Sequence, residues 1–324
     1  MRAAVCRTHG KPEVVVVDEL PPPPLGPGQV RAKVNAAAVN FPDVLIVANE
    51  YQVKIPTPFV PGSEFAGEVI DIASDVEGLA AGDRVFGTTF VGAFAEEVVV
   101  PAGSLTRTPH SVGDDAAAAF GVAHRTAYHA LRSVAQLQEG EELVVLGAGG
   151  GVGLAAVQLG RVLGARVTAV ASTAEKLDAA KTAGAERLVD HQAGDLRVAL
   201  RDSLDEGADV VIDPVGGRLA EPALRSLRWG GRFVTVGYAS GEIPRIPLNL
   251  VLLKGIHVAG FEIRSFLSRA EDEAARNEAE LIALLESGRA HPHIGATFAL
   301  DETAAALRYV ADGRAIGKVV LRLT

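Results

Sequence analysis

The sequence predicts an α/β fold with a doubly wound parallel sheet. A glycine-rich run at 147–153 lies between an apolar strand pattern, Glu142 to Leu146, and a helical pattern that begins at Leu154. Further along the chain, apolar strand-like runs alternate with helical ones, which is typical of parallel strands joined by crossover helices. These further strands are expected at Arg166 to Val170, Asp209 to Ile212, Arg232 to Val236 and His257 to Phe261.

The glycine run is typical of a phosphate-binding turn. Gly147, Gly150 and Gly153 allow a tight turn, and the absence of side chains lets backbone N–H groups approach a pyrophosphate. The helix that follows adds the positive end of its dipole. The spacing is G-x-x-G-x-x-G, with Ala148 where the usual first glycine of G-x-G-x-x-G would fall. The turn alone also suits a flexible loop, but strand, turn and helix together predict a Rossmann dinucleotide-binding domain.

The residues after the second strand favour a phosphorylated cofactor. An NAD-binding fold usually carries an Asp or Glu about 20 residues past the glycines, where it binds the ribose 2′-hydroxyl. This chain has Ser172 there and no acid. Ser172 can donate a hydrogen bond to a 2′-phosphate, and Lys176, one turn later, can neutralise its charge. NADPH is therefore predicted over NADH; the alternative is that Lys176 is a solvated lysine at a helix start.

Composition and charge exclude several classes of protein. The chain has 324 residues, a hydrophobic content of 48%, 35 glycines and a formal net charge of -9. This length predicts two domains, and the acidic balance argues against an electrostatic grip on nucleic acid or an anionic membrane. Cys6 is the single cysteine, so no internal disulfide is possible. With no apolar run of transmembrane length and no leader pattern at residues 1–10, a cytoplasmic protein is expected.

The two ends of the chain differ from its middle. In the first 120 residues, short strand-like runs broken by Gly, Pro and Asp predict a small barrel or distorted sandwich, and Asp114 to Leu131 predicts a connecting helix. Near the C-terminus, a lone helix from Glu271 to Leu285 and a lone strand from Ile316 to Leu323 cannot bury a core of their own. The expected domains are 1–122, 123–261 and a return of 262–324 to the first domain.

Further motifs occur along the chain in a fixed order. They are VNFPD at 39–43 followed by Tyr51, PGSEFAG at 61–67, AAGDRV at 80–85, DPVGG at 213–217, GGR at 230–232, GYASG at 237–241 and GKVV at 317–320. With the glycine turn, they resemble the medium-chain dehydrogenase/reductase superfamily, and within it the zinc-free NADPH:quinone oxidoreductases related to zeta-crystallin. The resemblance covers nearly the whole chain. It implies a GroES-like catalytic domain, built from both chain ends, and an active site in the cleft beside the Rossmann domain.

The resemblance also implies the residues that hold NADPH. His191 resembles the position of a tyrosine that packs near the adenosine in relatives, and could also simply cap its strand. The implied cofactor-binding residues are Asn40, Thr126, Gly150, Gly151, Val152, Gly153, Ser172, Lys176, His191, Val215, Gly237, Tyr238, Phe261 and Lys318.

No metal is expected. The zinc enzymes of the superfamily place a cysteine where this chain looks to have Asn40, and a histidine where it has Ser63 before Glu64. The region of the remaining catalytic ligand, 120–126, contains no cysteine. A tetrahedral N/S zinc site cannot be built with one cysteine.

A hydride transferred without a Lewis acid needs an acceptor that is already electrophilic, which favours quinones and conjugated enones. The catalytic candidates are Asn40, which the resemblance places near the nicotinamide and substrate, and Tyr51, which lines the cleft. Either could donate a hydrogen bond to the developing oxyanion, and Tyr51 could relay a proton. The alternatives are a buried turn cap for Asn40 and a cleft-wall aromatic for Tyr51. Asp43 is expected to order the loop of Asn40.

Departures from the family pattern leave the acceptor open. The stretch from Val47 to Tyr51 lacks an arginine common in related reductases, and Glu262 and Arg264 stand where close relatives have an aromatic-rich segment. Three functions therefore remain: an NADPH-dependent quinone or enone reductase, an enoyl-thioester reductase of the enoyl-CoA type, and a non-enzymatic NADPH-binding or RNA-binding crystallin-like protein.

The partners expected are a small electrophilic acceptor and a second copy of the chain, without nucleic acid or membrane. Ile243 to Leu253 is too apolar for an exposed loop. If the strand His257 to Phe261 pairs with its copy, as the resemblance implies, a homodimer covers this segment. The alternative is that the segment folds over its own sheet as a short helix.

Overall fold

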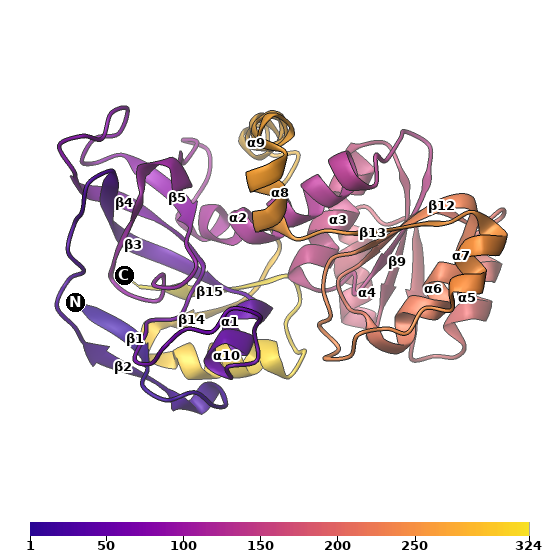
Figure 1. Ribbon diagram of the computed structural model, residues 1–324, viewed down its shortest axis with the longest axis horizontal. Coiled ribbons are helices and arrows are strands. Elements are labelled where there is room, and N and C mark those ends of the chain that lie inside the picture. The colour runs from indigo at the N-terminus through magenta and orange to yellow at the C-terminus, as the bar shows by residue number, and fades with distance from the viewer. Residues whose placement is uncertain (324) are drawn as a thin grey trace. The chain divides into compact units, whose positions relative to one another are not determined.

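The computed structural model describes residues 1–323, which form two compact units (Figure 1). The first unit contains Met1–Val122 and the C-terminal segment from Pro292, and the second contains Ala123–His291. Both ends of the chain therefore build the first unit. The chain returns to it at Pro292, later than the expected residue 262.

The first unit is formed around a seven-stranded sheet. Its elements are β1 (Arg2–Cys6), β2 (Val15–Glu19), β3 (Gln29–Val39), α1 (Phe41–Val47), β4 (Glu64–Ile72), β5 (Arg84–Thr88), β6 (Glu97–Pro101), β7 (Leu105–Arg107), β14 (Ile294–Ala299), α10 (Thr303–Ala311) and β15 (Lys318–Arg322). The strand order is β14-β15-β3-β4-β5-β7, with β6 also paired to β3, while β1 and β2 form a separate pair. The C-terminal strand β15 thus lies between β14 and the N-terminal strand β3, and Phe65, Phe86 and Phe94 are buried in this unit.

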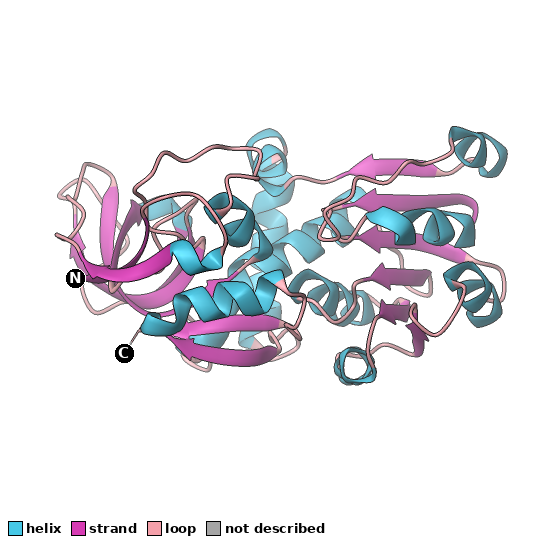
Figure 2. Ribbon diagram, turned by 90° about the horizontal axis from the view of Figure 1, so that it is seen from below, coloured by secondary structure: helices cyan, strands magenta, loops and turns pink. Residues whose placement is uncertain are grey.

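The second unit is a parallel six-stranded sheet with its crossover helices (Figure 2). After α2 (Asp114–His129), which spans the boundary, come β8 (Glu142–Leu146), α3 (Gly151–Val162), β9 (Arg166–Ala171), α4 (Ala174–Thr182), β10 (Arg187–Asp190), α5 (Leu196–Ser203), β11 (Ala208–Asp213), α6 (Ala220–Ser226), β12 (Leu227–Thr235), α7 (Leu248–Lys254), β13 (His257–Gly260), α8 (Ile263–Arg269) and α9 (Glu271–Glu286). The strand order β10-β9-β8-β11-β12-β13, parallel throughout, is that of a Rossmann domain. This confirms the expected fold class.

Buried polar contacts hold α9 in the second unit rather than the first. Arg125 Nε donates to Glu278 Oε2 at 2.8 Å, and Asn277 Nδ2 lies 2.9 Å from His129 Nδ1. Asn277 and His129 are fully buried. Buried polar side chains need partners, and these two meet each other across α2 and α9. These contacts explain why the chain returns to the first unit at Pro292 and not at residue 262.

The segment Ile243 to Leu253 does not form a covered loop. Its second half is α7, of which Leu250 is buried in the core of the sheet. Leu248, Leu252 and Leu253 are 76%, 81% and 71% exposed. The helix predicted as the alternative is therefore present, yet most of its apolar side chains are not covered by its own sheet. Among the described residues, no helix is long and apolar enough to cross a bilayer.

Candidate active site

The glycine turn between β8 and α3 leaves no room for a side chain at Gly153, its last glycine. A Cβ on Gly153 would lie 2.1 Å from the carbonyl oxygen of Gly147. Gly150 is the N-cap of α3 and provides no side-chain cap. The first N–H groups of α3 are therefore available, together with the helix dipole, to bind a pyrophosphate.

The predicted cofactor residues of the second unit share one edge of its sheet, except Thr126, which lies on α2. Parallel strands end on the same edge, which is where ligands bind in open α/β sheets. The turn residues Gly150, Gly151, Val152 and Gly153 follow β8, Ser172 and Lys176 follow β9, His191 follows β10, Val215 follows β11, Gly237 and Tyr238 follow β12, and Phe261 follows β13.

Lys176 is positioned over the glycine turn. A Cβ built on Gly149 would lie 2.5 Å from both Cβ and Cγ of Lys176, so the lysine stem occupies the space that Gly149 leaves free. Thr173, the N-cap of α4, accepts a hydrogen bond from the Lys176 N–H. Partial burial lowers the pKa of the Lys176 ammonium. The side chain is therefore packed against the turn rather than extended into water.

The turn after β11 is ordered by a buried carboxylate. Asp213 Oδ1 accepts hydrogen bonds from the N–H groups of Val215 and Gly216, both at 2.8 Å. Burial raises the pKa of Asp213, although these two N–H groups oppose the shift. The carboxylate thereby fixes the path of the chain just before Arg218.

Sequence reasoning missed Arg218. Its Nη2 lies 3.4 Å from Gln192 Oε1, in the turn after β10. Burial lowers the pKa of His191, and the charges of Arg218 and Lys176 lower it further. Arg218 therefore lies close enough to His191 for its charge to act on the imidazole. The available sequence signal was an arginine directly after the DPVGG motif.

Asn40 and Lys318 lie in the first unit, where they meet in a buried network. Lys318 Nζ donates to Asn40 Oδ1 and to Glu64 Oε1, both at 2.5 Å. Asn40 Nδ2 donates to Glu64 Oε1 at 2.9 Å, with longer contacts to Ser63 Oγ (3.3 Å) and Ala38 O (3.4 Å). Because an ammonium can only donate, Lys318 fixes the orientation of the Asn40 amide. The Lys318 ammonium is thus hydrogen-bonded to both Glu64 and Asn40.

Asp43 orders the loop of Asn40, as expected. The Asn40 N–H donates to Asp43 Oδ2 at 2.7 Å in a capping box at the start of α1. Complete burial raises the pKa of the Asp43 carboxyl to about 7, against the effect of the hydrogen bonds from Asn40 and Ser63 and the charge of Lys318. This buried acid therefore titrates near neutral pH.

Tyr51 is half-buried near Phe90, with ring centroids 6.2 Å apart. Its N–H donates to Leu45 O at 3.2 Å, which ties it to the end of α1. The backbone of Tyr51 is thus held at the end of α1, the helix that follows Asn40. Glu262 caps α8 through the N–H groups of Arg264 and Ser265.

Comparison with known proteins assigns the chain to a family. The model of the alcohol dehydrogenase GroES-like domain matches residues 26–110, and that of the zinc-binding dehydrogenase matches residues 151–282. Quinone oxidoreductase-like protein 2 of Bos taurus is 36% identical over 324 residues, which cover 99% of this chain and 92% of that protein. The chain belongs to the medium-chain dehydrogenase/reductase family.

Further relatives of this medium-chain oxidoreductase agree with the expected resemblance. The crystal structure of Escherichia coli quinone oxidoreductase complexed with NADPH matches with a TM-score of 0.92 and 26% identity over 100% of both chains. Polyketide synthase GfsB of Streptomyces halstedii is 38% identical over 92% of this chain, but this is 5% of that protein. The fold is therefore one that holds NADPH in a related enzyme.

The donor set of this medium-chain dehydrogenase/reductase does not fit the zinc that one family model names. Asn40 and Ser63 stand where the resemblance implies a cysteine and a histidine, and the adjacent carboxylate, Glu64, already accepts from Lys318 and from the Val122 N–H (2.7 Å). Cys6 is fully buried in β1. Among the described residues, no three His, Cys, Asp or Glu side chains are placed to hold a metal. An amide, a hydroxyl and an ammonium are not a zinc site.

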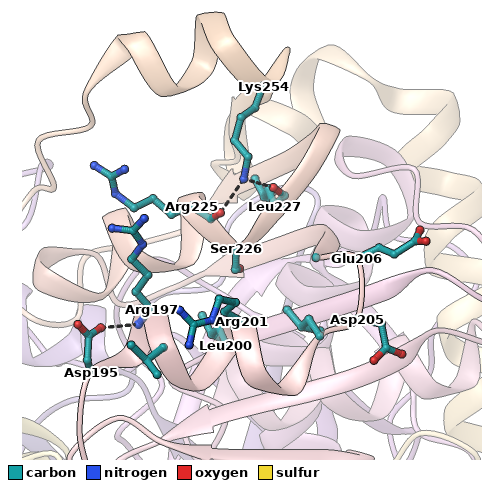
Figure 3. A pocket seen from close by; sticks show the side chains of 13 residues that line it. Asp195, Arg197, Leu200, Arg201, Asp205, Glu206, Arg225, Ser226, Leu227 and Lys254 are labelled. Carbon is teal, nitrogen blue, oxygen red and sulfur yellow. Dashed lines mark hydrogen bonds between the residues drawn. The ribbon is translucent and has the colours of Figure 1, made fainter.

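A hollow of about 660 Å³ lies elsewhere in the second unit (Figure 3). On its wall, Lys254 Nζ donates to the carbonyl oxygens of Arg225 and Leu227. Gly207 and Leu227 stand at the amino ends of β11 and β12, which is the edge opposite the glycine turn. This hollow therefore takes no part in the cofactor edge.

The raised pKa of Asp43 makes stability depend on pH. A carboxyl whose pKa is higher in the folded than in the unfolded protein stabilises the fold most when protonated. The free energy of unfolding is therefore expected to fall, by at most about 1.4 kcal/mol per pH unit, as pH rises from about 4 to about 7. Asp43→Asn keeps an acceptor for the Asn40 N–H but does not titrate, so it should remove this fall.

Denaturant unfolding of both proteins at several pH values measures the effect. The difference between wild type and Asp43→Asn isolates this one group, and Asp71→Asn, an exposed acid on β4, is the matched control. Identical pH profiles for wild type and Asp43→Asn would show that Asp43 is not titrating in this range.

Proposed function

We propose that this protein is an NADPH-dependent reductase that delivers hydride to a quinone or conjugated enone without a metal ion. The observation that carries the proposal is the buried network of Lys318, Asn40 and Glu64, because Asn40 and its contact Ser63 stand where the resemblance places two zinc ligands. Such a site offers hydrogen bonds to a substrate oxygen but no Lewis acid. It therefore suits an acceptor that is electrophilic by conjugation.

NADPH fits the residues present at the cofactor edge. Bound there, it would supply the hydride from its nicotinamide ring. The glycine turn leaves N–H groups free for the pyrophosphate, and Ser172 and Lys176 stand where a 2′-phosphate would be recognised. The related Escherichia coli enzyme bound to NADPH supports this assignment.

Asn40 is proposed to stabilise the oxyanion that forms on the acceptor. Its Oδ1 is held by Lys318 and one amide hydrogen by Glu64, whereas the remaining contacts, to Ser63 and Ala38, are long. The second amide hydrogen is therefore the one available to donate a hydrogen bond to a substrate oxygen. Lys318 is a positioning residue in this scheme, because its ammonium orients the amide and polarises it. Tyr51 is proposed to orient the carbonyl or relay the proton.

A conjugated enoyl thioester is the second candidate acceptor. The matching segment of polyketide synthase GfsB favours it. A non-enzymatic role in binding RNA is disfavoured by the net charge of -9.

A screen of acceptors tests the reaction. In the presence of EDTA, the purified protein should oxidise NADPH with quinones and conjugated enones, and elemental analysis should find no stoichiometric zinc. Simple ketones, which lack conjugation, are the control and should not react. A preference for enoyl thioesters would select the second candidate. Loss of activity on chelation would contradict the metal-free mechanism.

Cofactor preference tests the assignment of NADPH. The protein should bind NADPH at least tenfold more tightly than NADH, which is about 1.4 kcal/mol. Lys176→Glu should remove most of this margin and leave NADH binding nearly unchanged, because the changed charge faces the 2′-phosphate. Lys181→Glu, on the last turn of α4, is the matched control. Fluorescence titration measures both affinities of each of the three proteins, and equal values in the wild type would refute the assignment.

The exposed apolar side chains of the second unit support a homodimer. They belong to β12, α7 and the edge strand β13, and comprise Trp229, Leu248, Leu252, Leu253 and Val258. An edge strand has unpaired N–H and C=O groups, and an apolar surface beside it favours a covering partner. We propose that a second copy supplies this cover through a two-fold axis.

Sedimentation at micromolar concentration tests the assembly. Wild type should be a dimer, and Leu252→Asp with Leu253→Asp should give a folded monomer, because both side chains are exposed in the single chain. Leu250 is unsuitable for this test because it is buried in its own core. A monomeric wild type would disprove the interface.

A further inference from the structure

The hollow at the amino ends of β11 and β12 has the size of a small-molecule site. Its volume is about 660 Å³, and its walls come from α5, the turn before β11, the junction of α6 with β12, and Lys254 at the end of α7 (Figure 3). Ligand sites in proteins commonly measure about 300–1,000 Å³. The cofactor edge lies at the carboxyl ends of the same strands. A molecule in the hollow would therefore not compete with one on the glycine turn.

Three cationic side chains from three helices gather on one side of this hollow. Arg197 comes from α5, Arg225 from α6 and Lys254 from α7. Partial burial lowers the pKa of the Lys254 ammonium, and the charges of Arg225 and Arg197 lower it further. The three groups are therefore close enough to repel one another, and an anion among them would turn this repulsion into attraction.

Each of the three side chains keeps a donor for a ligand. Lys254 Nζ donates to Arg225 O at 2.6 Å and to Leu227 O, which fixes the ammonium on the wall and leaves one hydrogen over. Arg225 uses Nε and Nη2 for Glu221 Oε1, at 3.0 and 2.6 Å, so its Nη1 remains. Among the described residues, the Arg197 guanidinium forms no salt bridge. A ligand can therefore be bound without breaking an existing contact.

The opposite side of the hollow is acidic. Asp205 and Glu206, in the turn between α5 and β11, lie across the hollow from Arg197 and Arg225 (Figure 3). Both are exposed, and within the part of the chain that the structure describes neither forms a salt bridge. Carboxylates accept hydrogen bonds from hydroxyl groups. The hollow thus offers charged donors on one side and acceptors on the other.

We propose that this hollow is a second ligand site, which binds a small phosphorylated polyol such as a sugar phosphate. The phosphate lies among Arg197, Arg225 and Lys254, and the hydroxyl groups face Asp205 and Glu206. A phosphate monoester has three terminal oxygens and about two charges, which match donors from three helices and the two cations that no acid neutralises. The site goes beyond the proposed function, because the hydride is transferred elsewhere.

Direct binding to the full chain tests the proposal. Isothermal titration with inorganic phosphate, ribose 5-phosphate and ribose is carried out in a phosphate-free buffer, with and without saturating NADPH. NADPH fills the cofactor edge, so a phosphate that still binds in its presence is bound elsewhere. The variants are Arg197→Met and the pair Asp205→Asn with Glu206→Gln. Arg289→Met, an exposed arginine after α9 that does not line the hollow, is the matched control.

Ribose 5-phosphate should bind in the presence of NADPH, more tightly than inorganic phosphate, and ribose should not bind measurably. Arg197→Met should weaken both phosphates at least about fivefold, because it removes a charge-assisted hydrogen bond, and Arg289→Met should have no effect. The pair Asp205→Asn with Glu206→Gln should tighten inorganic phosphate, because it removes repulsion, and narrow the preference for ribose 5-phosphate.

Three results would each overturn the proposal. The first is loss of ribose 5-phosphate binding when NADPH is added, and the second is unchanged binding in Arg197→Met. The third is equal affinity of the wild type for inorganic phosphate and ribose 5-phosphate. Because Arg197, Asp205 and Glu206 are exposed, these variants should fold like the wild type, which thermal unfolding checks.

Discussion

The buried ion pair of Lys318 and Glu64 organises the first unit. Lysine and glutamate are almost never fully buried unless they are paired, and here each satisfies the other while Asn40 takes a further hydrogen bond. The pair joins β15, from the C-terminal segment, to β3 and β4 of the N-terminal one. Removing one charge alone would leave the other buried without a partner, at a cost of about 3–5 kcal/mol. The orientation of the Asn40 amide therefore follows from the same interaction that holds the C-terminal segment in place.

The sequence was most informative where structure is local. The glycine turn, the parallel strands and the capping role of Asp43 depend on residues close in the chain, and each pattern predicted its element. The contact between Lys318 and Glu64 could not be predicted, because the two residues are 254 positions apart and no local pattern pairs them. Arg218 was missed for a similar reason, since its place beside His191 depends on the strand order. The late return at Pro292 depends on buried side chains of α2 and α9 that meet only in the fold.

The net charge of the chain does not describe the local charge at the cofactor edge of the second unit. A net charge of -9 concerns the average surface and its long-range repulsion of anions. Lys176 and His191 are partly buried, and partial burial weakens the screening of their charges by water and salt. An acidic net charge is therefore compatible with the proposed preference for NADPH. The same difference between average and local charge applies to the hollow at the opposite sheet edge, where the charges of Arg225 and Arg197 act on Lys254.

Two titratable groups with shifted pKa values lie in different units and affect different steps. Asp43 supports the loop of Asn40, so its ionisation bears on the position of the proposed oxyanion donor. His191 follows β10 at the cofactor edge, so its ionisation changes the charge of that edge. The two ionisations can therefore be followed separately, that of His191 through NADPH binding without acceptor and that of Asp43 through turnover at saturating NADPH. Because the two pKa values move in opposite directions from their usual values, a pH profile of binding and one of turnover distinguish cofactor selection from hydride delivery.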